Sequence, residues 1–446
     1  AEIIGRERIE MQTGKGGLIS SIATSRPWSA AALLALWLIG PGSALAAQRE
    51  VTVYHSDLPF IEAMEAVAEE FMRENPDIAI VFEQQSGGEY YEALFTRLAG
   101  GSVPDIFRLG RSQSTQIRGY IEPVGPLLEK IGVQLDLLPY VRREETIDGV
   151  LTLFPIDWGT WVVYYHTELF DRAGVNYPSA GWTWTDFART AQRLTRIEDG
   201  RPVQFGHNQL NSWWGHWVQL LWQAGTVPID EAAGEPFPDV VLATRAFEFA
   251  QDLGFRWGAT PIPGFTLDGA SFENQAFAMQ WGITASLFRW AADPDLLPPG
   301  SWDIGPPPRG DGPTGRFAAE NHAQELAVAK DSPVQDAAVR FLAYLARPES
   351  QQTMFLTSQM LGASPAFVQW LGAQSRRGVA GLHLPSRLDV MFETFERSQF
   401  VLPDAVNWAT FTNTVTPLYQ QMLNDRGISP RAVVEQAKAM TAPLFQ

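Results

Sequence analysis

The sequence predicts an α/β fold in which parallel strands alternate with helices. Residues 51–54 read as a half-buried strand, and Pro59 opens a segment whose apolar residues recur at helical spacing until Asn75-Pro76 stops it. The stretch continues with a strand over 78–82, a helix over about 90–99 and a strand over 104–107. Strand, helix, strand, helix, strand at these lengths is typical of parallel βαβ units, whose ligands bind beyond the carboxyl ends of the strands.

Composition narrows the range of functions. The chain has 446 residues, enough for two domains or one large bilobed domain, and its formal net charge of −17 repels nucleic acid and anionic membrane surfaces. It has no cysteine, which excludes disulfides, thiolate metal sites, a cysteine nucleophile and a lipid-modified cysteine anchor. Six histidines leave little material for a metal site, and we expect neither a metal nor a cofactor.

The tryptophan content points to a class of ligand. The chain has 16 tryptophans, more than a core needs, because Trp is bulky and its N–H requires a partner when buried. Sugar-binding sites use flat aromatic faces against the C–H surface of the ring, with a few convergent polar groups. The content therefore favours a carbohydrate ligand, with core packing as the alternative role for most of these side chains.

The beginning of the chain carries an export signal. Lys15 and Arg26 precede an apolar run over 30–39 that is too short to span a bilayer, and Ala44-Leu45-Ala46 follows with small residues where a signal peptidase reads them. We expect cleavage near Ala46, so that residues 1–46, a signal peptide with an N-terminal extension, are absent from a periplasmic working protein. An uncleaved N-terminal anchor is the alternative.

The later part of the chain continues the α/β pattern. Pro155 is expected to interrupt a central strand and to mark a segment that crosses between two lobes. Residues 161–165 predict the next strand, and Thr183 is the expected N-cap of a helix, with Asp186 completing a weak capping box. The remaining predictions are a strand over 326–330, a helix over 334–345 and a second helix after Pro348.

Five short motifs are spread along this pattern. They are Asp148-Gly149-Val150-Leu151 before Phe154-Pro155, Tyr164-Tyr165-His166-Thr167-Glu168-Leu169-Phe170, Thr183-Trp184-Thr185-Asp186-Phe187, Ala278-Met279 followed by Gly282, and Phe341-Leu342 with Arg347-Pro348-Glu349-Ser350-Gln351. In this order the motifs resemble the family 1 extracellular solute-binding proteins, the sugar-binding components of ABC importers. The resemblance covers about residues 48–440, and it rests on the combination, since no single motif is specific.

The resemblance implies a two-lobed periplasmic-binding-protein fold, type II-like, whose discontinuous lobes are joined by hinge crossings and close on the ligand. It places the N-terminal lobe at residues 47–155 plus about 304–345, and the C-terminal lobe at about 156–303 plus 346–446. It also implies a binding protein and not an enzyme, with no catalytic residue. Such a protein captures a monosaccharide, oligosaccharide or glycoside and delivers it, as a monomer, to the permease subunits of an ABC importer.

The candidate ligand contacts combine ring faces or hydrogen-bonding groups with a place at a strand end or a crossing, because each sugar hydroxyl stripped of water needs a new partner. Strand ends supply Ser56, Asp57, Glu89, Tyr90 and Arg111; the crossings supply Asp157, Trp158 and Trp281; an aromatic cluster supplies Trp213 and Trp214; and a polar trio supplies Glu320, Asn321 and His322. Core packing, a hinge role or a solvated surface is the alternative for each of them.

The chain also departs from the family pattern. His322-Ala323 stand where the family often has two glycines, Thr284-Ala285 stand where an aromatic often follows the glycine of the second crossing, and His166 replaces the usual Asn. We therefore expect a reshaped pocket, and three alternatives stay open. They are a binding protein for a polyol or glycerol-phosphate-type solute, a secreted glycoside hydrolase that uses Asp157 and Glu320, and a binding module that serves a signalling receptor.

Overall fold

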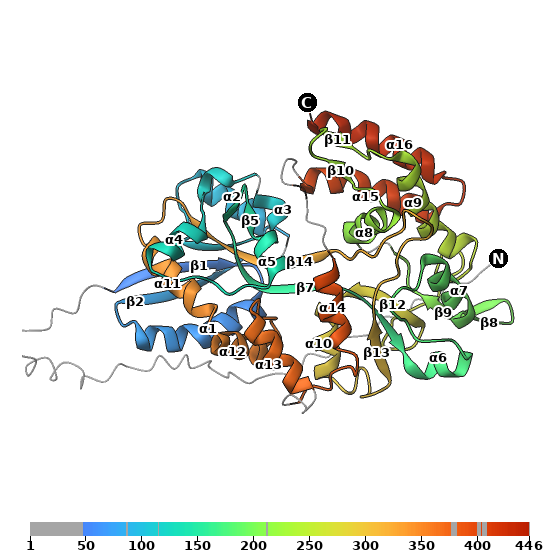
Figure 1. Ribbon diagram of the computed structural model, residues 1–446, viewed down its shortest axis with the longest axis horizontal. Helices are drawn as coiled ribbons and strands as arrows, with labels where there is room; N and C mark the ends of the chain where they lie inside the picture. Colours follow the sequence, from blue (N-terminus) through green and yellow to red (C-terminus); the bar gives the residue numbers. More distant parts are fainter. Residues whose placement is uncertain are drawn as a thin grey trace, which may run out of the picture. The chain divides into compact units, whose positions relative to one another are not determined.

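The computed structural model describes residues 48–445, except 86–87, 115, 211–212, 376–380, 399–402 and 404–407. The expected signal peptide and its cleavage point near Ala46 lie outside the described residues. Residues 48–446 form one compact unit of mixed α/β structure (Figure 1). Among the helices of the described residues, none combines the length and the apolar character that a membrane crossing requires.

The strands of the unit are β1 (Arg49–His55), β2 (Ile78–Gln84), β3 (Ile106–Leu109), β4 (Ile121–Glu122), β5 (Thr146–Ile147), β6 (Val150–Leu151), β7 (Phe154–His166), β8 (Arg196–Glu198), β9 (Arg201–His207), β10 (Ile229–Asp230), β11 (Glu235–Pro236), β12 (Phe277–Ile283), β13 (Trp302–Gly305) and β14 (Asn321–Ala329). The main sheet has 10 strands in the order β2-β1-β3-β14-β7-β12-β9-β8, with β13 beside β7 and β4 beside β14. Strand β1 pairs in parallel with both β2 and β3, which confirms the predicted βαβ units.

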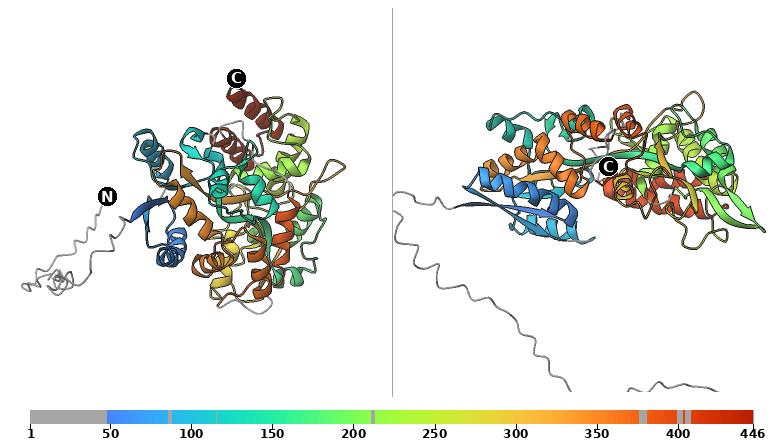
Figure 2. Two further views of the ribbon diagram at one scale, coloured as in Figure 1. Left: turned by 60° about the vertical axis from the view of Figure 1, so that its left-hand side comes forward. Right: turned by 90° about the horizontal axis from the view of Figure 1, so that it is seen from below.

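The helices are α1 (Leu58–Glu74), α2 (Tyr90–Ala99), α3 (Arg111–Ser114), α4 (Val124–Lys130), α5 (Pro139–Glu144), α6 (Thr167–Ala173), α7 (Trp184–Leu194), α8 (Trp214–Ala224), α9 (Val240–Phe255), α10 (Ala285–Ala292), α11 (Gln335–Leu345), α12 (Pro348–Ser358), α13 (Pro365–Ser375), α14 (Asp389–Arg397), α15 (Trp408–Asn424) and α16 (Pro430–Thr441). Helices cover both faces of the sheet (Figure 2). Helix α1 ends before Asn75-Pro76 as predicted, and α7 begins at the predicted capping box of Thr183 and Asp186.

One prediction about the crossing is wrong. Pro155 does not interrupt the chain's central strand, because β7 runs unbroken from Phe154 to His166. The proline stands second in the strand, where its partner β14 shifts register between Gln324 and Glu325. A local irregularity of this kind accommodates a residue that has no N–H to donate to the ladder.

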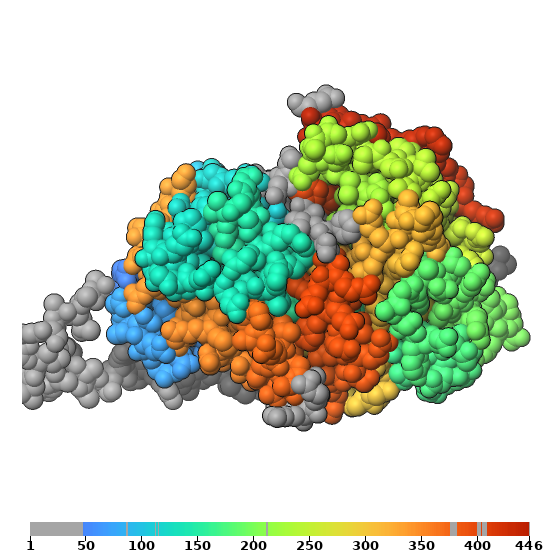
Figure 3. All heavy atoms as spheres, viewed as in Figure 1, coloured from blue at the N-terminus to red at the C-terminus, as the bar shows by residue number. Residues whose placement is uncertain are grey.

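The hydrophobic side chains form cores to either side of the crossing strands. One core joins α1, α4, α11, α12 and α14 to β1 and β7, and a smaller one joins α2 to the other face of β1, β3 and β14. A further core joins α7, α8, α9, α15 and α16 to β12. Helix α12 packs on α1, and α14 packs on β7. In Figure 3 the orange to red-orange residues of the late helices lie between the teal residues on the left and the green residues on the right. The lobe boundaries remain a prediction.

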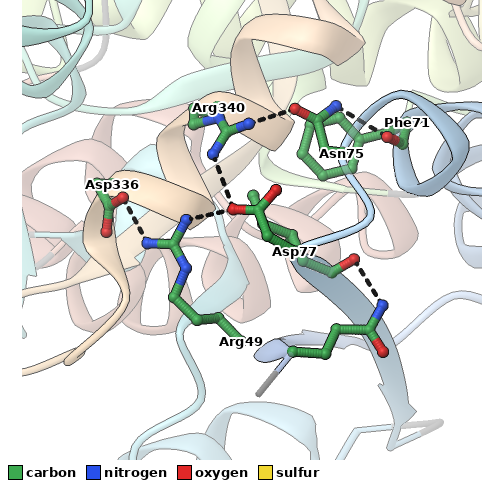
Figure 4. Close-up of polar contacts among 8 residues, drawn as sticks. Arg49, Phe71, Asn75, Asp77, Asp336 and Arg340 are labelled. Atoms are coloured by element: carbon green, nitrogen blue, oxygen red, sulfur yellow. Dashed lines mark hydrogen bonds and ion pairs between the residues drawn. The ribbon is translucent and has the colours of Figure 1, made fainter. Parts of the chain in front are cut away.

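A polar network at the start of β1 ties distant segments of the chain together (Figure 4). Arg49 forms ion pairs with Asp77 at 2.9 Å and with Asp336 at 2.6 Å. Arg340 from α11 reaches the same Asp77 carboxylate at 3.4 Å and donates a hydrogen bond to Asn75. Single exposed ion pairs stabilise a fold by about 0–1 kcal/mol, so this network orients β1 and α11 more than it stabilises the unit.

Candidate ligand-binding site

The candidate site lies where β7 and β14 run side by side. The two strands pair antiparallel, with His322 opposite Gly159 and Gln324 opposite Asp157. This pairing brings Asp157 and Trp158, predicted at the first crossing, next to the polar trio that was predicted far along the chain.

A cavity of about 150 Å³ opens beside the paired strands. It is lined by Phe60, Asp157, Trp158, Thr284, Ala285, Phe288, Arg289, His322, Ser358, Gln359, Met360 and Leu361. Three of the sequence-predicted contacts are therefore among its walls. Sites for drug-sized ligands have volumes of about 300–1,000 Å³, so this conformation has room for a small ligand only.

Asp157 and Trp158 anchor the segment that follows α12 to the crossing. Asp157 Oδ1 accepts a hydrogen bond from Leu361 N at 2.6 Å, and Trp158 Nε1 donates to Gly362 O at 2.9 Å. Burial raises the pKa of Asp157 to about 6, although the Leu361 N–H and the charge of His322 act against it. The Trp158 indole is 1% exposed, so it shapes the wall of the cavity from within the core.

His322 forms another wall of the cavity, and it fits there because residue 159 is glycine. A Cβ at Gly159 would lie 2.4 Å from His322 Nε2 and 2.9 Å from Thr284 Oγ1, closer than real contacts allow. The other ring nitrogen, Nδ1, lies 3.5 Å from Glu320 Oε2. Burial lowers the pKa of the imidazole, but Glu320 and Asp157 together outweigh burial and raise the pKa above its ordinary value of 6.5.

The predicted aromatic cluster reaches the same crossing. Trp213 stacks on Trp161 with 5.7 Å between ring centroids, and its ring lies 6.2 Å from that of His322. Trp214 meets Trp213 at 4.6 Å, and both are partly exposed. Trp281, in contrast, is 1% exposed in the core and is not part of the cavity wall.

The first two members of the polar trio are engaged with protein groups. Glu320 Oε2 accepts a hydrogen bond from Trp161 Nε1 at 2.6 Å. Asn321 Oδ1 accepts from Thr160 Oγ1 at 2.5 Å, and its Nδ2 donates to Phe395 O at 3.1 Å. Both side chains are buried, so in this conformation they support His322 and the crossing instead of lining the cavity.

The ends of β1 and β3 supply a second group of polar side chains. Ser56 is 7% exposed, and its Oγ has no hydrogen-bond partner among the described residues. Asp57 lies 3.7 Å from Arg108 Nε, and Arg108 also donates to Gln324 Oε1 at 2.9 Å and to Tyr91 Oη at 3.1 Å. Arg108, which the sequence did not single out, thus links the strand end to β14.

The loop before α2 and the first residue of that helix supply Glu89 and Tyr90. The Tyr90 hydroxyl donates to the backbone carbonyls of Tyr54 and Arg108 at 3.1 and 2.9 Å, and its ring stacks on Tyr54 in the core. Glu89 is exposed at the N-cap of α2. The structure does not bring either residue into the cavity.

Arg111 is buried among carboxylates, although an exposed position was the alternative for it. Its Nε lies 3.6 Å from Glu144 Oε2, and its backbone N donates to Glu325 Oε1 at 3.4 Å. Burial raises the pKa of Glu144 to about 7, against the effect of Arg111. Burial, together with Glu325 and Glu144, raises the pKa of Glu145 well above its ordinary range.

Sequence reasoning missed several residues of the site. Phe60 and Arg289 line the cavity without belonging to any motif, because their helices α1 and α10 meet the crossing only in the folded chain. Thr284, the N-cap of α10, was noted only as a departure from the family pattern. The sequence could have indicated Gly159, because an isolated glycine inside a strand often marks the close approach of another group. Over the described ranges, no group of three or more His, Cys, Asp or Glu side chains could hold a metal ion.

Comparisons with known proteins agree with this architecture. The model of the bacterial extracellular solute-binding protein family matches residues 59–352. A mannitol-binding protein of Pseudomonas aeruginosa is 28% identical over 211 residues, which are 44% of this chain and 47% of that protein. The sn-glycerol-3-phosphate-binding periplasmic protein UgpB of Escherichia coli is 27% identical over 182 residues, 36% of this chain and 39% of that protein. The aligned stretches therefore span less than half the length of these relatives.

Solved structures share the fold. An ABC substrate-binding protein from Listeria monocytogenes in complex with cycloalternan has a TM-score of 0.72 at 21% identity, covering 88% of this chain and 98% of that one. The sugar-binding protein MalE from Xanthomonas citri has a TM-score of 0.72 at 18% identity, covering 89% and 97%. These likenesses establish a two-lobed α/β fold. Together with the family match over most of its length, they show that this chain belongs to the bacterial extracellular solute-binding protein family.

Proposed function

We propose that this protein binds a carbohydrate outside the cytoplasm and hands it, chemically unchanged, to the permease subunits of an ABC importer. The observation that carries the proposal is the cavity at the crossing, where α1, α10, both crossing strands and the segment after α12 converge on Asp157 and His322. In a two-lobed protein, we expect a bound ligand to touch the strands that connect the lobes at this place.

Hinge closure follows from this position. A ligand shifts an equilibrium only by its difference in affinity for the two forms, so a ligand at the crossing that contacts both lobes favours the closed form. The aromatic pair Trp213 and Trp214 supplies partly exposed rings next to the cavity, as stacking on a sugar requires. A monomer in the periplasm, freed from the signal peptide near Ala46, is the form in which we expect this cycle to run.

The relatives support a polyhydroxylated ligand. Among the proteins similar to this chain, one is named for mannitol and others were solved with cycloalternan or named for sugars. One group of relatives is named for sn-glycerol-3-phosphate, which keeps a phosphate ester as the alternative ligand class.

Thermal unfolding tests the proposal. The full chain is expressed in a Gram-negative host, purified from the periplasm and melted with D-mannitol, maltose, D-tagatose, D-glucose or sn-glycerol-3-phosphate. A ligand at about 100 times its dissociation constant stabilises the native state by roughly 2.7 kcal/mol, which raises the melting temperature by several degrees. We expect such a shift with at least one sugar or polyol, and recovery of that compound unaltered.

A matched pair of variants locates the site. Asp157→Asn removes the cavity's carboxylate and should reduce the ligand-induced shift, whereas Asp199→Asn changes an exposed turn residue and should leave the shift unchanged. Consumption of the sugar would contradict the proposal in favour of a hydrolase. The absence of a shift with every compound would contradict the carbohydrate assignment.

A further inference from the structure

The ionisable groups of the cavity are few. The wall contains Asp157, His322 and Arg289 as its charged side chains. Arg289 is already engaged, since its guanidinium donates to Glu273 Oε1 at 2.7 Å and is 61% exposed. Asp157 and His322 are the charged groups of the wall that lie on the paired crossing strands.

One nitrogen of the His322 imidazole faces an acid without a hydrogen bond to it. Its Nδ1 lies 3.5 Å from Glu320 Oε2, and Glu320 is itself fixed by Trp161 Nε1. Its Nε2 packs against Gly159, and any side chain at position 159 would clash with the ring. Within the described part of the chain, Nε2 has no hydrogen-bond partner, so its N–H is available to a ligand.

The charges of this wall nearly cancel. The imidazolium of His322 balances the carboxylate of Asp157, and Glu320 behind the ring adds a further negative charge. A phosphate monoester carries about two negative charges and is bound elsewhere by clusters of arginine or by helix N-termini. Here it would meet the carboxylate of Asp157 and the imidazolium of His322, whose charge Glu320 offsets from behind the ring.

We infer that His322 and Asp157 form a donor and acceptor pair that selects a neutral ligand with neighbouring hydroxyl groups and rejects a phosphate ester. This inference rests on the proposed function and decides between its two ligand classes. A hydroxyl group both donates and accepts, so one hydroxyl accepts from His322 Nε2–H while its neighbour donates to the free oxygen of Asp157. Hydrogen bonds to charged groups are the stronger kind, which makes this pair the specificity determinant of the cavity.

Both members of the pair must be in their charged form. Deprotonation of Asp157 requires a pH above about 6. Protonation of His322 requires a pH below its raised pKa, which depends on burial, Glu320 and Asp157, with Arg289 as the other charged group at the cavity. Affinity should therefore rise as the pH rises through about 6 and fall again as the pH rises through the raised pKa of His322.

Isothermal calorimetry on the full-length purified protein, between pH 5 and pH 9, tests the inference with D-mannitol, maltose, D-tagatose and sn-glycerol-3-phosphate. We expect the neutral compounds to include the ligand, sn-glycerol-3-phosphate to bind at least 100-fold more weakly, and the affinity to rise as the pH rises through about 6 and to fall again at higher pH. His322→Gln should lower affinity about 10-fold or more and remove the alkaline limb. Asp157→Asn should remove the acidic limb.

Exposed His383→Gln is the matched control and should bind as the wild type does. Tighter binding of sn-glycerol-3-phosphate, an affinity independent of pH, or an unchanged His322→Gln variant would overturn the inference while leaving solute binding intact. If His322→Gln does not fold, the wild-type pH profile and the phosphate comparison still decide. Failure of every compound to bind at every pH overturns the proposed function as well, so the two failures are distinguishable.

Discussion

At the scale of single residues, the most unusual feature is a set of buried acids next to the crossing. Glu144, Glu145 and Glu325 are at most 5% exposed, and the guanidinium of Arg111 lies 3.6 Å from Glu144 Oε2. Both carboxylate oxygens of Glu145 have no hydrogen-bond partner among the described residues. An uncompensated buried charge is costly, so these side chains favour their neutral, protonated form.

These acids link stability to pH. Burial raises the pKa of Glu144 to about 7 and that of Glu145 and Glu325 above their ordinary range, so the folded protein holds protons that the unfolded chain has released. Stability is then lost as pH rises toward the folded pKa values, by up to about 1.4 kcal/mol per pH unit for each such group. We expect the melting temperature to fall between pH 6.5 and pH 8.

The choice of pH window and variants makes this prediction specific. Below pH 6.5 the buried histidines His55, His207 and His216, whose pKa values burial lowers, act in the opposite direction. Glu145→Gln should flatten the decline above pH 6.5, whereas exposed Glu92→Gln should leave it unchanged, both measured by differential scanning calorimetry. A decline of equal slope in Glu145→Gln would contradict the assignment.

At the scale of elements, local rules predicted some boundaries and tertiary pairing moved others. Helix α7 begins where its capping box predicts, because the required hydrogen bonds join residues only three apart. Strand β7 runs through Pro155, because its partner β14 shifts register there and no local rule contains that partner. Strand β3 begins at Ile106, one residue after Asp105. The Asp105 carboxylate accepts hydrogen bonds from Thr52 N at 2.8 Å and from Ser332 Oγ at 2.6 Å.

The capping box gives a prediction at this scale. Thr183 Oγ1 accepts from Asp186 N at 3.2 Å, and Asp186 Oδ2 accepts from Thr183 N at 3.0 Å. Thr183→Ala removes the cap and should lower the free energy of unfolding by about 1 kcal/mol, measured by urea denaturation. Thr183→Ser keeps the hydroxyl and should remain within about 0.5 kcal/mol of the wild type. Equal losses in both variants would show that packing of the threonine methyl group dominates.

At the scale of the whole molecule, one sheet runs through the described unit. Strands β7 and β14 lie between the strands that serve the different cores, so neither core can lose its strands without disturbing the other. The packing of α12 on α1 adds a contact between an early and a much later segment of the chain. Such interleaved connectivity favours unfolding as one cooperative unit.

Equilibrium unfolding checks this expectation. Tryptophan fluorescence and far-ultraviolet circular dichroism, followed against urea, should give coincident single transitions with one midpoint. Trp158→Phe, which deletes the hydrogen bond to Gly362 O at the crossing, should shift both transitions together to lower urea. Two separated midpoints, or a shift confined to one probe, would mean that the cores unfold independently.

The sequence by itself determined the parallel βαβ units, the capped start of α7 and the family pattern, since each depends on residues close together in the chain. It also singled out Asp157 at a crossing and His322 in a polar trio, without bringing them together. The tertiary structure decided which candidates share a cavity, because the pairing of β7 with β14 sets His322 over Gly159 beside Asp157, and buried Trp281, Tyr90 and Arg111 elsewhere. Contacts between strands so distant in sequence depend on register and close packing, which no local pattern encodes.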